Sequence, residues 1–227
     1  MNKAFEEDLD KLRSRLIRMG SLVEEQVEFA FRALREGNAE LAKIVMERDD
    51  KVDKLDLKID KQCQRIFALN QPVASDLRLL LAAIKINNEL ERIGDLAADI
   101  ARLVPDAPGA VVVARDLDVE RMTNAVFTLF KASIDAYINN DPELASHILP
   151  TDSTVDGLYA DLQKRLVEYM SANTSTIADG SRLLLSLQKM ERLADHATNI
   201  AENVIFFVRA KQVRHSSLTG EEGQAAD

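Results

Sequence analysis

The sequence predicts an all-α protein made of two tandem, internally duplicated three-helix bundles. Gly and Pro are scarce, with 8 and 5 residues among 227, and Trp is absent, which is typical of long helices rather than sheets. Apolar residues recur at steps of three and four along almost the whole chain, which is the spacing of amphipathic helices. The second half of the chain also repeats the first. Together these observations give the fold class.

The first bundle is expected over residues 1–104, as three helices joined by short turns. The first apolar stripe begins at Phe5 and is interrupted by the EGN segment at 36–38. The second stripe ends at the NQP segment, 70–72, and the third runs from there to 104. Gly, Asn and Pro interrupt helices, so these segments are predicted turns.

Residues 105–115, PDAPGAVVVAR, are expected to form a linker, because they contain Pro and Gly and lack a helical period. The second bundle is expected over residues 116–213. Its three helices are predicted at 116–140, 142–172 and 176–213. Residues 214–227 are polar and poor in apolar residues, so a disordered tail is predicted there.

An internal repeat relates the two halves. Shifted by 103, residues 33–76 match 136–179 at 11 of 44 positions without a gap. A three-residue deletion then aligns ERIGDLAADIA with ERLADHATNIA. A repeat of this length indicates duplication of one helical unit.

The charge and the single cysteine limit the function classes. A net charge of −9 and a pI of about 5.0 argue against a nucleic-acid partner and against unaided docking on an anionic membrane. Cys63 is the single cysteine, which favours a reducing, cytoplasmic setting. There is no apolar run of signal-peptide or membrane-spanning kind. We therefore expect contact with a membrane only indirectly, through partners.

Acidic residues recur four positions apart at matched places in the two halves. Because a spacing of four puts two carboxylates on one helix face, each pair points to one side of its helix. The pairs are Asp49 and Asp53, Glu91 and Asp95, Asp152 and Asp156, and Glu191 and Asp195.

Antiparallel pairing brings these acids to the same level. Residues that face each other across an antiparallel hairpin have numbers with a constant sum. The numbers of Asp53 and Glu91 average 72, and so do those of Asp49 and Asp95. Residue 72 lies inside a predicted turn, so each pair faces across this hairpin. The matched pairs of the second half have their midpoint beside Asn173. Each hairpin is therefore predicted to hold four carboxylates roughly 25–30 Å from its turn.

Four carboxylates at one level repel each other unless a cation or a proton offsets their charge. Clusters of carboxylates suit hard cations, and helical bundles hold di-metal sites in this way. We therefore predict one metal site per bundle, for a divalent or iron ion (Mg, Mn, Ca, Zn or Fe). The candidate ligands are Asp49, Asp53, Glu91, Asp95, Asp99, Asp152, Asp156, Glu191 and Asp195.

Simpler interpretations exist for the same acids. Asp49 and Asp53 flank the apolar stripe of their helix, so a solvated acidic face also explains them. Arg92 follows Glu91, and Arg192 follows Glu191, so an ion-pair network is the alternative there. No Glu-x-x-His ligand pair, P-loop or nucleophile–base pair is found in the sequence. We therefore expect no enzyme and assign no catalytic residue.

Three segments resemble one known family. NQPVASDLR (70–78), KINNELERIGDLAADIA (85–101) and MERLADHATNIAENVIF (190–206) are similar to the PhoU family of phosphate-specific transport accessory proteins, over roughly 5–210. The resemblance implies two three-helix bundles, a homodimer, and metal ions at the E/D-x-x-x-D motifs. It also implies a cytoplasmic negative regulator of phosphate-starvation signalling and phosphate uptake.

In that role the protein would link the ATPase subunit of a phosphate ABC transporter to a sensor histidine kinase. Two alternatives stay open. One is an accessory protein of a different phosphate permease. The other is a metal-dependent, carboxylate-bridged enzyme, such as an oxidase or a phosphohydrolase.

Overall fold

The structure, a computed structural model, describes residues 3–210, and every regular element in that range is helical. The prediction of an all-α protein with two repeated bundles is confirmed. The first bundle consists of α1 (Lys3–Glu36), α2 (Ala39–Asn70) and α3 (Ala74–Asp106). The second consists of α5 (Glu120–Asn139), α6 (Pro142–Ile148), α7 (Asp152–Ala172) and α8 (Ile177–Arg209), and α4 (Pro108–Asp116) lies between the two bundles in sequence.

Both turns of the first bundle lie where the sequence places them. Gly37 ends α1 with a φ of +67°, a conformation that glycine adopts without strain. The side chain of Asn38 then caps α2 by accepting a hydrogen bond of 3.0 Å from the backbone N–H of Leu41. Residues 71–73 separate α2 from α3, so the predicted NQP turn is confirmed.

Residues 105–115 lie between the two bundles as expected, but the expectation that they lack helical structure is wrong, because most of them are helical. Residues 105–106 complete α3 and 108–116 form α4. Pro108 occupies the first turn of α4, where a proline costs no hydrogen bond. Four of its residues are buried: Ala110, Val111, Val113 and Ala114. Tertiary packing therefore stabilises this helix, which is too short to show a clear apolar period in the sequence.

Three expected helix bounds in the second half also differ. The helix expected at 142–172 divides into α6, a 3₁₀ turn at Leu149–Thr151 and α7, because Pro150 has no N–H to continue the helix. The helix expected from 116 begins as α5 at Glu120. Helix α8 ends at Arg209, and the tail expected at 214–227 lies outside the described residues.

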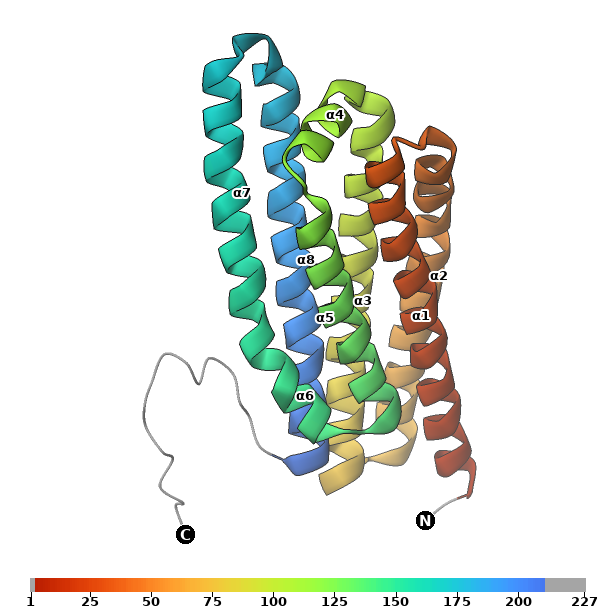
Figure 1. Ribbon diagram of the computed structural model, residues 1–227. Helices are drawn as coiled ribbons and strands as arrows, with labels where there is room; N and C mark the ends of the chain where they lie inside the picture. Colours follow the sequence, from red (N-terminus) through yellow and green to blue (C-terminus); the bar gives the residue numbers. More distant parts are fainter. Residues whose placement is uncertain (1–2, 211–227) are drawn as a thin grey trace.

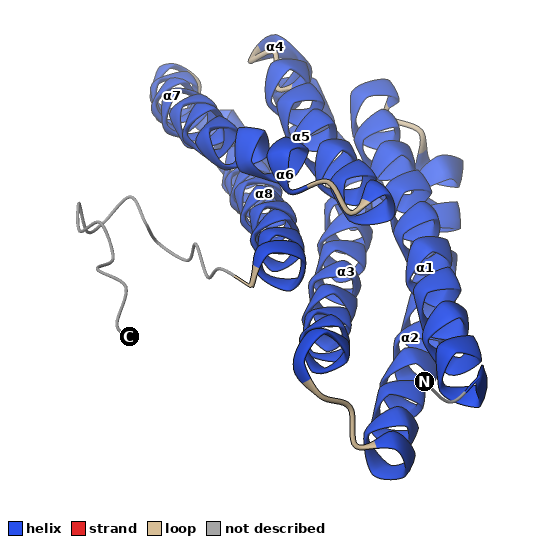
Figure 2. Ribbon diagram, turned by 90° about the horizontal axis from the view of Figure 1, so that it is seen from below, coloured by secondary structure: helices blue, strands red, loops and turns tan. Residues whose placement is uncertain are grey.

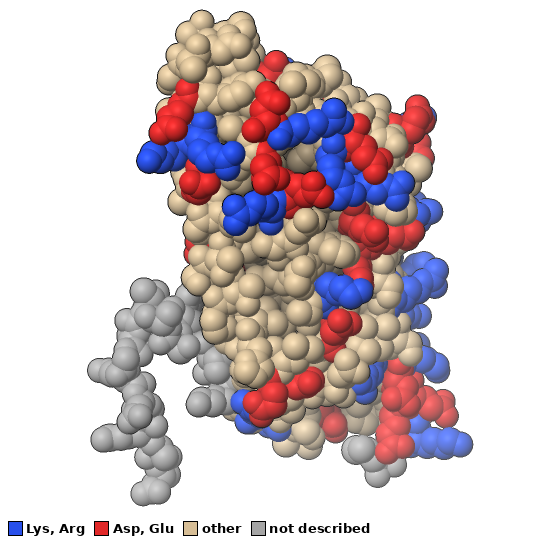
Figure 3. Space-filling view, in the orientation of Figure 1, with Lys and Arg blue, Asp and Glu red and all other residues tan. Residues whose placement is uncertain are grey.

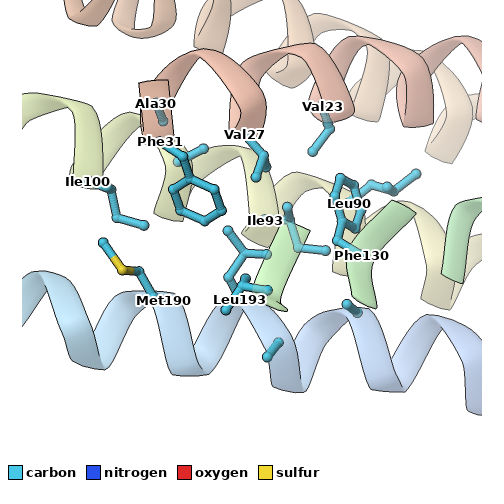
Figure 4. Close-up of a cluster of buried hydrophobic side chains, with 14 of the residues drawn as sticks. Val23, Val27, Ala30, Phe31, Leu90, Ile93, Ile100, Phe130, Met190 and Leu193 are labelled. Atoms are coloured by element: carbon cyan, nitrogen blue, oxygen red, sulfur yellow. The ribbon is translucent and has the colours of Figure 1, made fainter. Parts of the chain in front are cut away.

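The two bundles are packed against each other. In two perpendicular views, α1 and α2 lie on one side of the molecule and α7 on the other, with α3, α5 and α8 between them (Figures 1 and 2). Helices α3 and α8 pack along each other. Figure 4 shows the core where α1, α3, α5 and α8 meet, with the buried side chains of Val23, Leu90, Ile93, Phe130 and Leu193. One hydrophobic core therefore runs through both bundles.

Candidate metal centre

The hairpin of α2 and α3 brings three predicted ligands together. Oxygen atoms of Asp53, Glu91 and Asp95 all lie within 4.8 Å of one another. Asp53 is exposed, while Glu91 and Asp95 are half-buried. In residues 3–210 no other three acidic, histidine or cysteine side chains gather this closely. The register deduced from the midpoint of the hairpin therefore agrees with the structure.

The cluster is electrostatically unfavourable without a cation. Burial, and then repulsion from Asp95, raises the pKa of Glu91. Burial, and then repulsion from Asp53, raises the pKa of Asp95. The Arg92 guanidinium lies 3.4 Å from Glu91 and 3.9 Å from Asp95 and lowers both pKa values. One arginine beside three carboxylates leaves negative charge that favours a multivalent cation.

Asp49, the fourth predicted ligand, is anchored by a residue that the sequence reasoning missed. The side-chain amide of Gln26 donates a hydrogen bond of 3.1 Å to Asp49 and one of 3.2 Å to the carbonyl oxygen of Gly94. Gln26 is fully buried. It stands three residues after Val23, on the buried stripe of α1, and that position was the available signal. Burial raises the pKa of Asp49, and the hydrogen bond from Gln26 lowers it.

Gly94 allows the helices to approach closely beside this cluster. A Cβ atom at Gly94 would lie 3.3 Å from Cγ1 of Val52 on α2, a buried side chain. The absence of a side chain therefore lets α3 pack on α2 and brings its backbone within reach of Gln26.

Asp99, a further predicted ligand, forms ion pairs with basic side chains. Its carboxylate lies 2.7 Å from Nζ of Lys189 on α8 and 2.8 Å from Nη1 of Arg102. The pair with Lys189 joins the two bundles, while the pair with Arg102 lies within α3. Asp99 is not one of the three acids whose oxygen atoms lie within 4.8 Å of one another. The sequence motif E-x-x-x-D-x-x-x-D therefore supplies two cluster residues and one residue of the bundle contact.

In the second half the four predicted acids lie near enough to affect one another's pKa, but no three of them gather within 4.8 Å as the acids of the first half do. Burial raises the pKa of Glu191, followed by repulsion from Asp195 and Asp156. Burial and then repulsion from Asp152 and Asp156 raise the pKa of Asp195. Burial followed by repulsion from Asp156 raises the pKa of Asp152. These four carboxylates thus act on one another across α7 and α8, as predicted from the midpoint at Asn173.

The counter-charges of the second cluster also differ. Within residues 3–210, none of its four carboxylates has a cationic nitrogen within 4.0 Å. The hydroxyl of Thr198 donates a hydrogen bond of 3.2 Å to Asp152, the role that the Gln26 amide has for Asp49. The acids of the two clusters occupy matching positions in the sequence repeat, but the side chains that contact them differ: Arg92 and Gln26 in the first half, and Thr198 in the second.

His196 and Asn199 belong to the contact between the bundles. Nδ1 of His196 lies 2.6 Å from Oε2 of Glu89 on α3, and the Asn199 amide donates a hydrogen bond of 3.2 Å to the same oxygen. His196 also lowers the pKa of Asp195, the neighbouring acid of the second cluster, through its charge. The sequence did not predict the role of His196 and Asn199 at this contact, because the packing of α8 on α3 produces no regular spacing of residues along either helix.

Both bundles match one known protein family. The PhoU domain model matches residues 16–104 and 119–204, which correspond to the two bundles. A phosphate-specific transport system accessory protein PhoU homolog from Pseudomonas aeruginosa is 37% identical over 225 residues, covering 96% of this chain and 91% of that protein. A homolog of the same description from Zymomonas mobilis is also 37% identical, covering 97% of this chain and 95% of that protein.

Solved structures agree with these relatives. The crystal structure of PhoU from Pseudomonas aeruginosa superposes with a TM-score of 0.85 at 37% identity, covering 91% of this chain and all of that one. A phosphate transport system regulatory protein PhoU from Streptococcus pneumoniae shares the fold, with a TM-score of 0.81 at 24% identity. Sequence match and fold agree over both bundles, and the chain therefore belongs to the PhoU family.

Proposed function

We propose that this chain is an accessory protein of a phosphate-specific transport system and a negative regulator of phosphate-starvation signalling and phosphate uptake. The observation that carries the proposal is the family match over both bundles, with relatives named as accessory proteins of phosphate-specific transport. The chain is proposed to act in the cytoplasm as a homodimer. Within residues 3–210, no helix has an apolar stretch sufficient to cross a bilayer.

In this proposal the protein links two others, the ATPase subunit of a phosphate ABC transporter and a sensor histidine kinase. It works by binding rather than by catalysis. The long packed helices support this part, because they offer broad surfaces for partner proteins.

The carboxylate clusters are proposed to hold metal ions. Asp49, Asp53, Glu91 and Asp95 would hold a cation in the first bundle. The all-oxygen donor set, and the grouping of Asp53, Glu91 and Asp95 within 4.8 Å, fit a hard cation such as Mg²⁺, Mn²⁺, Ca²⁺ or iron. In the second bundle the ligands would be Asp152, Asp156, Glu191 and Asp195. A bound ion would supply positive charge that fixes the spacing of two helices.

The regulatory role is tested by deleting the gene in its host and measuring phosphate uptake and a phosphate-starvation reporter in phosphate-rich medium. Loss of the protein should raise both, and the wild-type gene should restore repression. Pulldowns with the purified transporter ATPase and the kinase test the two links separately. Unchanged uptake and reporter activity after deletion, together with failure to retain either partner, would contradict the proposal.

A further inference from the structure

A basic groove lies on the first bundle, between α1 and α2. Its volume is about 580 Å³, and residues of these two helices alone line it. Five lining side chains are basic and one is acidic: Arg18, Arg48, Lys51, Lys54, Lys58 and Glu25. The groove therefore carries four net positive charges in a chain whose net charge is −9. Figure 3 shows Lys and Arg side chains projecting along the margin where α1 and α2 lie.

Most of these cations have no acidic partner within the described residues. Arg48 is the exception, since its Nη1 lies 2.6 Å from the Glu25 carboxylate and its guanidinium lies 4.8 Å from the centre of the Phe29 ring. In residues 3–210 no carboxylate oxygen comes within 4.0 Å of the amine of Lys51, Lys54 or Lys58. Like charges three and four residues apart on one helix repel each other, so an anionic partner would relieve this arrangement.

The groove has two defined ends and an apolar floor. At one end Arg15 donates a hydrogen bond of 2.6 Å from Nη1 to Oε1 of Gln62, which bridges α1 and α2. At the other end Arg48 covers Phe29. Between Arg48 and Lys58, the first and last lining residues on α2, the helix rises by roughly 15 Å, about three helical turns. The floor contains the half-buried side chains of Leu22 and Leu55.

We propose that this groove binds an amphipathic acidic helix of a partner protein. The apolar strip of that helix would contact Leu22 and Leu55, and its flanking carboxylates would pair with the free lysines and Arg18. Helix-in-groove recognition uses this combination of an apolar floor and charged rims. The inference rests on the proposed function in one respect, namely that the chain acts through protein partners, and it is independent of the metal clusters.

The shape and chemistry of the groove favour a helix over other anions. A flat bilayer surface does not reach the leucines on the floor of a groove between two helices. Single-stranded nucleic acid is held by stacking on exposed aromatic rings, and Phe29 is covered by Arg48. A single phosphate ion is far smaller than an array of cations that extends over several turns of α2.

Photo-crosslinking in the cells that produce the protein tests the inference. A benzophenone amino acid replaces Ser21, which lines the groove and is exposed, and in a parallel chain replaces exposed Val112 on α4. The crosslinked peptide is then sequenced. The double variant Lys51→Glu/Lys58→Glu is compared with Arg121→Glu/Lys164→Glu, which makes the same charge change at exposed positions outside the groove. Circular dichroism confirms that each variant is folded.

The expected result is a crosslink at position 21 to a protein segment with apolar residues three and four apart and several acidic residues beside them. Its yield should fall at least tenfold in Lys51→Glu/Lys58→Glu and persist in the control variant. Crosslinks to lipid or nucleic acid, to a segment without this pattern, or to nothing at all overturn the inference, as does a crosslink that survives the charge reversal. A protein crosslinked from position 112 but not from position 21 would contradict binding in the groove, while leaving the proposed function intact.

Discussion

The buried amide of Gln26 on α1 donates a hydrogen bond of 3.1 Å to the Asp49 carboxylate on α2. A second one, of 3.2 Å, reaches the carbonyl oxygen of Gly94 on α3. One side chain thus joins all three helices of the first bundle beside the carboxylate cluster. The shift of 103 residues that relates the two halves places Leu129 at the matching position, where it is buried. The fold therefore accepts leucine at this place, which makes Gln26→Leu an informative substitution.

Gln26→Leu is expected to weaken cation binding in the first bundle. Without the hydrogen bond the pKa of Asp49 rises further, so protons compete better with the cation. The free energy of unfolding in the presence of a chelator should fall by about 1–3 kcal/mol, because Asp49 and the Gly94 carbonyl both lose the donor while they stay in the fold. Calorimetric titration with Mn²⁺ at neutral pH measures the affinity. Gln64→Leu, at an exposed position of α2, is the control, and equal affinities in both variants would count against the role of Gln26.

The stability of the metal-free protein should fall as the pH rises through the raised carboxylate pKa values. The pKa values of Glu91, Asp95, Glu191 and Asp195 are higher in the folded protein than usual, so the folded state binds more protons than the unfolded state. The stabilisation of the folded state by this extra proton binding is therefore complete below the ordinary carboxylate pKa of about 4, and it is lost as the pH rises through the raised pKa values. Urea unfolding in chelator, from pH 4 upward, measures the slope.

The variant Glu91→Gln/Asp95→Asn should have a flatter stability profile than the wild type over this range. The control Glu7→Gln/Glu168→Gln removes two exposed acids outside the clusters and should keep the wild-type slope. The pKa argument is wrong if the cluster variant and the control lose stability with pH to the same extent.

Phe130→Ala is expected to destabilise both bundles at once. Phe130 is fully buried where side chains of α1, α3, α5 and α8 meet (Figure 4). Removing a buried phenylalanine side chain costs about 3–5 kcal/mol. Since one core connects the bundles, calorimetry should show a single transition at a lower temperature. Val167→Ala, at a side chain that is 51% exposed, should cost about 0.5 kcal/mol or less. Two separate transitions would contradict a shared core.

Cys63 should resist thiol reagents in the folded protein. Its side chain is buried, and burial followed by repulsion from Asp60 raises the pKa of the thiol to about 12. The thiolate is the reactive species, so Ellman's reagent at pH 8 should give no signal until guanidinium unfolds the chain. The variant Ala178→Cys, at an exposed position, provides the positive control. Rapid reaction of the native wild-type protein would show that Cys63 is accessible.

Local patterns in the sequence predict the long helices and the level of the acids. The turns near residues 72 and 173 fix the register of α2 on α3 and of α7 on α8. Both helices of a hairpin rise by the same distance per residue, so residues equally far from the turn in sequence lie at the same level. This is why the grouping of Asp53, Glu91 and Asp95 follows from residue numbers. Helix α4 was missed because nine residues are too few for a reliable period, and the burial of its valines is decided by tertiary packing.

Contacts between the bundles could not be deduced from the sequence. Asp99 continues the four-residue spacing of the predicted ligands, and its pair with Lys189, 90 residues away, has no signal in that spacing. The Glu89–His196 contact joins the same two helices. Both depend on how α8 docks on α3, a relationship between two helix faces that neither helix encodes alone. Gln26 was readable in principle, since a polar residue on a buried stripe requires a partner.

Carboxylates of α2 and α3 gather in the first bundle, those of α7 and α8 interact in the second, and we propose that each set binds a cation. Equilibrium titration with Mn²⁺, followed by electron paramagnetic resonance, tests it most directly in wild-type protein, Glu91→Gln/Asp95→Asn and Glu191→Gln/Asp195→Asn. The account predicts binding in both halves of the wild type and the loss of one half's sites in each double variant, while the exposed control Glu47→Gln/Asp50→Asn binds as the wild type does. Equal Mn²⁺ binding by all four proteins, or no binding by the wild type, would contradict the claim.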